Sequence, residues 1–234
     1  SAFETYMTHG GLPGVCFMRN QKNREQRIKD QLETILGRDL HLVLQTTLSY
    51  QQVFDYVRLL ARHQGQPIHF TAFKKQIGIA ESTQKKLLFA LESVFLCRSM
   101  PIEGGRKGIV LYLEDQAEAL FLAHGQIAEY DQFSHAVYRN FRAQFFYEIG
   151  MDARFFQYRT RGNALIPCAV QTKEGFVGVL PLREGDQPTR SEILSAQSFI
   201  RVFGPTARIV LVHRSRTFKT YGPQILALPA ELLG

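Results

Sequence analysis

Two short stretches of this chain carry side chains that can bind phosphate. Hydroxyl, ammonium and guanidinium groups all donate hydrogen bonds to phosphate oxygens, and the two cationic groups add charge. The first stretch lies at the start of a predicted helix, and the second lies in a Gly-rich turn. The side chains are Ser82, Thr83, Lys85 and Lys86 in the first stretch, and Arg106 and Lys107 in the second. They predict phosphate contacts rather than bond-breaking chemistry.

The residue types that perform catalysis are not arranged in a known pattern. The histidines, at positions 9, 41, 63, 69, 124, 135 and 213, lack the spacing of metal ligands. No Gly-x-Ser-x-Gly motif or Cys–His pairing indicates a nucleophile. Cys16, Cys97 and Cys168 are far apart in apolar surroundings, which indicates buried thiols in a reducing compartment, the cytoplasm. We expect no catalytic residue and no metal site in this chain.

Composition and charge are those of a globular protein with a basic surface. The chain has 234 residues, of which 45% are hydrophobic, and a formal net charge of +7. The basic excess is largest in residues 151–234. No apolar run reaches the length of a membrane span. The charge permits contact with nucleic acid, and a solvated basic surface without that role is the alternative.

The first half of the chain follows helical periodicity, and its helices position the phosphate-binding side chains. A helix over Phe3–His9 and a long amphipathic helix from Asn20 fill a helical segment, residues 1–48. Helices at Tyr50–His63, Phe70–Ile77 and 82–96 follow, with Thr71 and Ser82 as expected caps and Gly78 as a left-handed turn. We expect the helix at 82–96 to bury one face, formed by Leu87, Leu88, Leu91, Val94 and Phe95.

A hairpin tip at 102–108 and a strand at Ile109–Leu113 come next. Three helices followed by a β-hairpin are typical of a winged helix-turn-helix, here residues 49–123, with 82–96 as its recognition helix. The phosphate partner would then be DNA, bound weakly and in a salt-sensitive manner. Winged helices also serve as protein-docking or lid elements, and that alternative stays open.

The second half changes to a mixed pattern. Helices are expected at Gln116–Ala123 and Phe133–Ile149, with a boundary between them at 124–131. We expect strands at 154–159, 165–171 and 176–182, a helix from Thr189 or Arg190 to Phe203, and strands at 207–213 and 225–228. This order predicts a small α/β domain over 130–234. The apolar strand at 207–213 is typical of a buried parallel position.

Several motifs accompany this order of helical segment, winged helix and α/β domain. They are Tyr6 before Gly10-Gly11-Leu12-Pro13, Arg38-Asp39 within Thr34–Leu40, Gly78-Ile79, the strand end Tyr112–Asp115 and the strand Phe155–Gly162. Together they resemble the C-terminal half of a family of prokaryotic AAA+ ATPases, whose last domain is like the PD-(D/E)XK nucleases. Gly10, Gly11, Pro13, Arg38 and Asp39 are the most specific. Locally, Arg38-Asp39 also fits an ordinary surface charge pair.

The resemblance implies that an ATPase core, with its ATP and Mg²⁺, lies upstream of this chain and is its partner domain. No Gly-x-x-x-x-Gly-Lys-Ser/Thr loop occurs in these residues, so no cofactor is expected here. We therefore expect the chain to be a fragment of a longer protein that does not hydrolyse ATP by itself.

The resemblance also shows where nuclease acids would fall. Nucleases of this kind gather two or three acidic groups around Mg²⁺, with a lysine near the attacked phosphate. On this chain the helix acid falls near Arg139, the strand acid near Ile166 and the Glu-x-Lys at 178–180. None of these residues is acidic, and the lysine is absent. The nearest carboxylates, Glu148, Glu174 and Glu184, stand at the ends of elements.

The sequence therefore favours a non-catalytic region of an AAA+-type ATPase. Its winged helix would contact DNA or dock, and its inactive nuclease-like domain would serve assembly or recognition. The alternatives are a free-standing DNA-binding regulator, with 130–234 as a sensor or dimerisation domain, and an active Mg²⁺-dependent nuclease. The oligomeric state is left open, and no membrane contact is expected.

Overall fold

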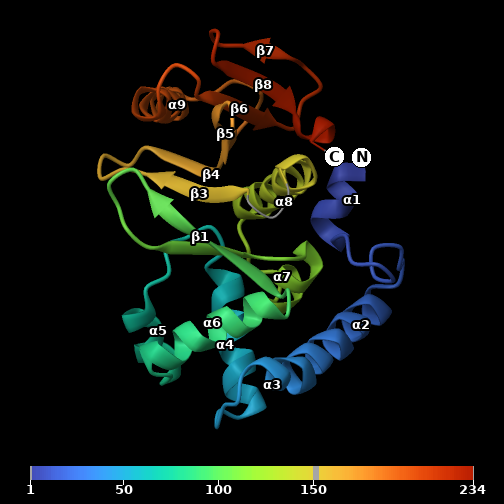
Figure 1. Ribbon diagram of the computed structural model, residues 1–234. Coiled ribbons are helices and arrows are strands. Elements are labelled where there is room, and N and C mark those ends of the chain that lie inside the picture. The colour runs from blue at the N-terminus through green and yellow to red at the C-terminus, as the bar shows by residue number, and fades with distance from the viewer. Residues whose placement is uncertain (1, 150–152, 234) are drawn as a thin grey trace. The chain divides into compact units, whose positions relative to one another are not determined.

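The computed structural model describes residues 2–149 and 153–233, apart from the side chains of 146–149, and shows a mixed α+β protein (Figure 1). Contacts divide it into two compact units. We call residues 4–99 and 111–128 the helical unit, and residues 1–3, 100–110 and 129–234 the sheet unit. Within the described residues, no helix is long and apolar enough to cross a membrane. The three-part division at 1–48, 49–123 and 130–234 stays a prediction.

The helical unit contains most of the predicted helices. The long amphipathic helix is confirmed, and its second half is a π-helix that continues into a short α-helix, which keeps Leu32, Leu36 and Leu40 buried. The elements are α1 (Ala2–His9), α2 (Gln21–Thr34), η1 (Ile35–Asp39), α3 (Leu40–Val43), α4 (Tyr50–Arg62), α5 (Phe70–Ile77), α6 (Glu81–Ser93) and α7 (Gln116–Leu122).

A buried glutamine holds the turn between α5 and α6. Gly78 adopts the left-handed conformation predicted for it, with φ of 72°. The Gln84 side-chain amide donates to the carbonyl oxygens of Phe70 at 3.1 Å and Ile79 at 2.7 Å. The Tyr56 hydroxyl donates to the Gln84 carbonyl at 3.0 Å. These bonds satisfy polar groups that have no access to water, and so fix the angle between the two helices.

Three local predictions about α5 and α6 were wrong. Thr71 does not cap α5; its hydroxyl donates to the Glu81 carboxylate at 2.8 Å instead. Ser82 does not cap α6, because the helix already begins at Glu81, whose negative charge suits a helix N-terminus. Phe95 is not buried. The helix ends at Ser93, and Phe95 follows in a left-handed conformation with 72% of its side chain exposed.

The sheet has eight strands in the order β2-β1-β3-β4-β5-β6-β8-β7. Strands β3, β4 and β5 form an antiparallel meander, and β5, β6 and β8 run parallel. The predicted parallel position of β6 is thus confirmed. The strands are β1 (Cys97–Glu103), β2 (Ile109–Leu113), β3 (Arg154–Arg159), β4 (Leu165–Thr172), β5 (Gly175–Pro181), β6 (Arg208–His213), β7 (Lys219–Thr220) and β8 (Ile225–Pro229).

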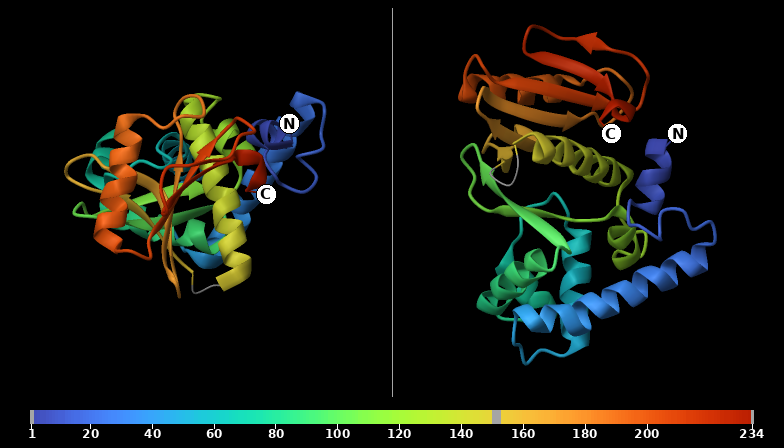
Figure 2. Two further views of the ribbon diagram at one scale, coloured as in Figure 1. Left: turned by 90° about the horizontal axis from the view of Figure 1, so that it is seen from above. Right: turned by 45° about the vertical axis from the view of Figure 1, so that its right-hand side comes forward.

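Helices α8 (Glu129–Ile149) and α9 (Arg190–Phe203) lie on opposite faces of the sheet unit's strands (Figure 2). Thr189 and Glu192 form a capping box that starts α9 at the predicted residue. The α9 face of the sheet is an aromatic core, in which the rings of Phe156, Tyr158 and Phe199 pack together. A short 3₁₀-helix, η2 (Ala230–Leu232), follows β8.

A bulge in β4 decides which residues face which helix. Phe156 pairs with Ala169, and Tyr158 pairs with Ile166, so β4 has one residue more than β3 between these pairs. Pro167 lies in this bulge, where its missing N–H breaks no regular ladder bond. Cys168 consequently faces α8. Burial raises the pKa of its thiol, and the nearby Arg142 of α8 acts in the opposite direction.

The sequence reading missed three elements or boundaries in this part of the chain. Strand β1 was not predicted, and Ile102 and Glu103, expected in the hairpin tip, belong to it; the strand lies between β2 and β3. Helix α8 begins at Glu129 and so takes up the end of the expected boundary at 124–131. The two-residue β7, which pairs with β8, carries no apolar alternation that would predict it.

Candidate functional site

The first group of predicted phosphate-binding residues lies on α6 in the helical unit. Ser82, Lys85 and Lys86 are exposed, and Thr83 is half-buried. The Lys85 ammonium lies 5.6 Å from the centre of the Phe70 ring. Within the described residues, no carboxylate pairs with Lys85 or Lys86. Both charges are therefore accessible to an anion.

The second group lies in the sheet unit, on the turn between β1 and β2. Arg106 and Lys107 are both exposed there. The Arg106 guanidinium donates to the Asn163 side-chain oxygen, on the β3–β4 turn, at 3.2 Å. Burial, and secondly the charge of Arg106, lower the pKa of Arg159 at the end of β3. The structure thus brings Arg106 close to a second arginine, Arg159, that had not been selected from the sequence.

The family-motif glycines have a structural role within the helical unit. The Asp115 carboxylate accepts the N–H groups of Gly11 and Ala117, each at 2.7 Å. Gly10 has φ of 68°, and a Cβ on it would lie 2.2 Å from the Asp115 Oδ1. Only glycine fits at position 10, because both its conformation and this contact exclude a side chain. This contact joins two of the motifs that carry the resemblance.

The other motif residues lie at the surface. Pro13 is exposed in the turn that follows the two glycines. The Arg38 guanidinium donates to the Asp39 carboxylate at 2.8 Å, and the Arg38 side chain is 74% exposed. Arg38 and Asp39 therefore form the ordinary surface pair that the local reading offered.

The structure brings only some of the expected nuclease positions together. Ile166, Gly178 and Leu180 face α9, whereas Arg139 belongs to α8 on the opposite face. A Cβ on Gly178 would meet Ile166 and Ile209 at 3.0 and 2.8 Å, so that position is closely packed. The face of Ile166 depends on the β4 bulge, which the sequence could not reveal. Facing α8 instead are Cys168 and its partner Val179, which are not acidic either. Glu148 lies outside the residues whose side chains are described.

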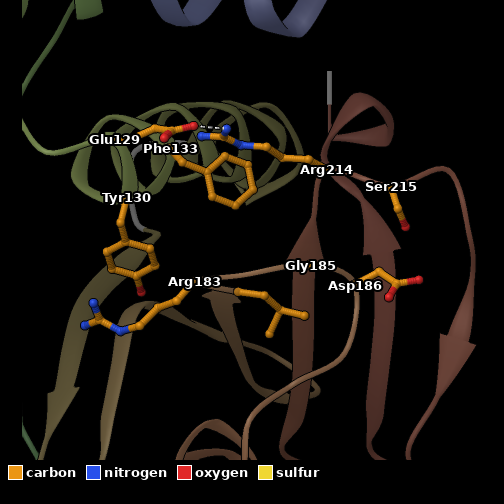
Figure 3. Close-up of a pocket in the computed structure, with 9 residues that line it drawn as sticks. Glu129, Tyr130, Phe133, Arg183, Gly185, Asp186, Arg214 and Ser215 are labelled. Carbon is orange, nitrogen blue, oxygen red and sulfur yellow. Dashed lines mark hydrogen bonds and ion pairs between the residues drawn. The ribbon is translucent and has the colours of Figure 1, made fainter.

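A cavity of about 520 Å³ lies where β5 and β6 end (Figure 3). Some of the charged side chains in its walls form ion pairs with side chains of opposite charge. The Arg214 guanidinium pairs with Glu129 and lies 4.9 Å from the Phe133 ring centre. The Asp186 carboxylate pairs with Lys219 at 2.8 Å, and this hydrogen bond lowers its pKa. Arg214, one of the two arginines that line this cavity, thus already holds a carboxylate, so this part of the cavity offers little to an anion.

A second cavity, of about 600 Å³, shares Tyr130 and Arg183 with the first. Its walls come from the end of β3, the β3–β4 turn, the end of β5 and α9. Arg159, Arg183 and Arg201 all line it. Within the described residues, none of the three forms an ion pair with a carboxylate, although Arg183 is close enough to Asp131 to act on it: burial raises the pKa of Asp131, and the charge of Arg183 opposes that rise. The sequence reading missed this set because its members are far apart in the chain; the charge excess of 151–234 was the one available signal.

Comparison with known proteins adds a partial match. A family model described as "Domain of unknown function (DUF8612)" matches residues 1–102, which is less than half of the chain. Neither the curated proteins nor the solved structures contain a match. In the part of the chain that the structure describes, no group of three or more His, Cys, Asp or Glu residues could hold a metal ion.

Proposed function

We propose that this chain is the non-catalytic C-terminal region of an AAA+-type ATPase. In this proposal α4, α5, α6 and the β1–β2 hairpin form a winged helix that contacts DNA, and residues 129–233 form an inactive nuclease-like domain that takes part in recognition. The upstream core would supply ATP binding and Mg²⁺.

The observation that carries the proposal is the topology of the sheet unit together with the residues on it. An antiparallel meander, a helical crossover and a further parallel strand, with a helix on each face, is the arrangement expected of a nuclease-like domain. On both faces the central positions of β4 and β5 are apolar or thiol-bearing: Ile166, Gly178 and Leu180 on one, Cys168 and Val179 on the other. Phosphoryl transfer by two metal ions needs carboxylates at such positions.

Contact with DNA is supported by the accessible cations of both units. Lys85 and Lys86 project from the second helix of a helix-turn-helix pair, which is the helix that enters a groove in such motifs. Arg106 and Lys107 project from a hairpin tip. A handful of phosphate contacts of this kind gives weak, salt-sensitive and sequence-tolerant binding.

DNA binding at low salt tests the proposal. The quadruple variant Lys85→Ala, Lys86→Ala, Arg106→Ala, Lys107→Ala should bind a DNA duplex at least tenfold more weakly than the unaltered chain, with a shallower salt dependence. A matched control removes four exposed cations around α2, by Arg19→Ala, Lys22→Ala, Arg27→Ala and Lys29→Ala, and should lose much less. Equal losses in both variants would mean that net charge alone, and not this surface, binds the DNA.

Two further measurements test the rest of the proposal. Incubation with plasmid and Mg²⁺ should leave the DNA intact, as in EDTA; metal-dependent nicking would replace the proposal with an active nuclease. The reading frame upstream of residue 1 should encode a phosphate-binding loop within about 200 residues. A start codon next to residue 1 would favour a free-standing regulator instead.

A further inference from the structure

The second cavity of the sheet unit is lined by three arginines. Its arginines come from three separate elements: Arg159 from the end of β3, Arg183 from the loop after β5, and Arg201 from α9. Guanidinium groups fit phosphate oxygens in a bidentate manner. Three guanidinium groups around one cavity repel one another, and a bound anion would relieve this repulsion.

The one carboxylate in the wall is already engaged. Glu192 accepts the Thr189 N–H at 2.7 Å, the Thr189 hydroxyl at 2.7 Å and the Arg183 backbone N–H at 3.0 Å. Its oxygens thus cap the start of α9 and fix the loop that carries Arg183. The Arg183 guanidinium itself stacks on the Tyr130 ring, with 4.2 Å to the ring centre. Figure 3 shows this arginine below the tyrosine, and both residues line both cavities.

Neighbouring contacts hold the site in place. The Tyr130 hydroxyl donates to the Pro181 carbonyl at 3.3 Å, so its ring is held across the end of β5. The Ser195 hydroxyl accepts the Leu165 N–H at 3.3 Å, which leaves its own proton to be donated. Arg106 approaches the same rim through its bond to Asn163. A cation and a donor thus stand at the rim and wall besides the three arginines.

The size and walls of the cavity indicate more than a bare phosphate. Its volume of about 600 Å³ is in the range of small-ligand sites. Leu165, Leu180 and Leu194 add apolar surface to the walls, and Tyr130 adds an aromatic ring. A phosphodiester carries a single negative charge, whereas a phosphomonoester carries about −1.5 to −2 near neutral pH and better matches three guanidinium groups.

We propose that this cavity binds a nucleoside phosphomonoester, with Arg159, Arg183 and Arg201 around its phosphate and the nucleoside against Tyr130 and the leucines. The same chemistry is offered by a free mononucleotide and by the 5′-phosphorylated end of a DNA strand. For the strand end, the inference rests on the DNA contact proposed above. The cavity adjoins the expected nuclease positions, because Leu180 lines it, but Glu192, the carboxylate described in its wall, already caps α9, so the site holds a phosphate without cleaving it.

Binding to matched probes tests the inference. A single-stranded 12-mer with a 5′-phosphate should bind the unaltered chain about tenfold more tightly than the same strand with a 5′-hydroxyl. In isothermal titration, adenosine monophosphate should bind and adenosine should not. Discrimination in either pair supports the site, and which pair shows it identifies the source, strand end or free nucleotide. The absence of discrimination in both pairs overturns it.

Variants locate the discrimination. Arg159→Gln with Arg201→Gln should abolish the tenfold preference, whereas Arg216→Gln, which removes an arginine outside the cavity, should retain it. If the double variant unfolds, Leu194→Glu serves instead, because Leu194 is 54% exposed and a carboxylate there would repel the phosphate. A preference that survives these changes contradicts the site. Loss of DNA binding with retained adenosine monophosphate binding would sink the proposed function alone.

Discussion

Cations on the two units of this protein are placed differently. On the helical unit, unpaired cations such as Lys85 and Lys86 project from a helix into solvent, and others pair along their own helix, as Lys29 does with Glu33 at 3.7 Å. On the sheet unit, Lys219 pairs with Asp186, but Arg159, Arg183 and Arg201 line one cavity. Solvated charges cost a fold almost nothing, whereas clustered ones oppose each other. The difference points to the sheet unit as the place of a defined ligand.

The cores of the two units differ as well. Aliphatic side chains fill most of the helical unit, as at Leu32, Leu36 and Leu60. The sheet unit instead packs aromatic rings between β3 and α9, where the Phe199 ring lies 5.4 Å from that of Tyr158 and 4.6 Å from that of Phe203. Large rings lose more contact area when truncated, so single substitutions should damage the two units unequally.

Phe199→Ala should have the largest effect. Phe199 is fully buried at the centre of the aromatic core, so truncation should lower the free energy of unfolding by about 3–5 kcal/mol. Phe89→Ala is the matched control on a helix of the other unit; Phe89 is 68% exposed, and its loss should cost at most about 0.5 kcal/mol. Urea unfolding followed by circular dichroism measures both. Equal losses would mean that Phe199 does not hold the aromatic core of the sheet unit together.

Gly10→Ala should have the next largest effect, and it tests the helical unit. Gly14→Ala is the control, because both glycines have positive φ but nothing lies within 4 Å of a Cβ on Gly14. Because alanine is strained in a left-handed backbone conformation, each variant should lose about 1 kcal/mol of unfolding free energy. The contact with Asp115 should add about 2 kcal/mol for Gly10→Ala alone. Thermal unfolding measures the difference, and two equal midpoints would mean that the loop can move away from Asp115.

Acidification should cause the smallest loss of stability, and this loss should come from the sheet unit. His213 is fully buried on β6, and burial lowers its pKa although the Asp186 charge acts in the opposite direction. The unfolded chain therefore binds this proton first, so the stability is present above the ordinary value of about 6.5 and is lost as pH falls below it. Between pH 7.5 and 5.5 the melting temperature of the unaltered chain should fall more than that of His213→Asn. If the melting temperature of His213→Asn fell more than that of the unaltered chain, the pKa of His213 would not be lowered by folding.

Much of the architecture was predictable from the sequence, and local chemistry explains why. Some elements depend only on residues that are close together in the chain. These are the apolar stripes of α2 and α4, the capping box of Thr189 and Glu192, and the continuous apolar run of β6. Strand β1 was not predicted, because its place in the sheet depends on pairing Ile102 with Gln157, far along the chain.

The sites were less predictable, for a physical reason. Exposed side chains such as Lys85 and Arg106 could be identified from their local pattern. The arginine cavity could not, because Arg159, Arg183 and Arg201 belong to three elements that meet only after the sheet has formed. The face of each β4 residue also depended on the bulge at Pro167, which moves Cys168 toward α8.

The pairing of β1 with β3 limits how this chain can be shortened. Residues 100–110 are held by the sheet unit, although the segments on either side of them belong to the helical unit. A chain that ends at residue 128 would leave β1 without its parallel neighbour, and its main-chain N–H and C=O groups would be free to pair with another molecule. Such a fragment should aggregate, and the same edge is exposed during synthesis until β3 leaves the ribosome.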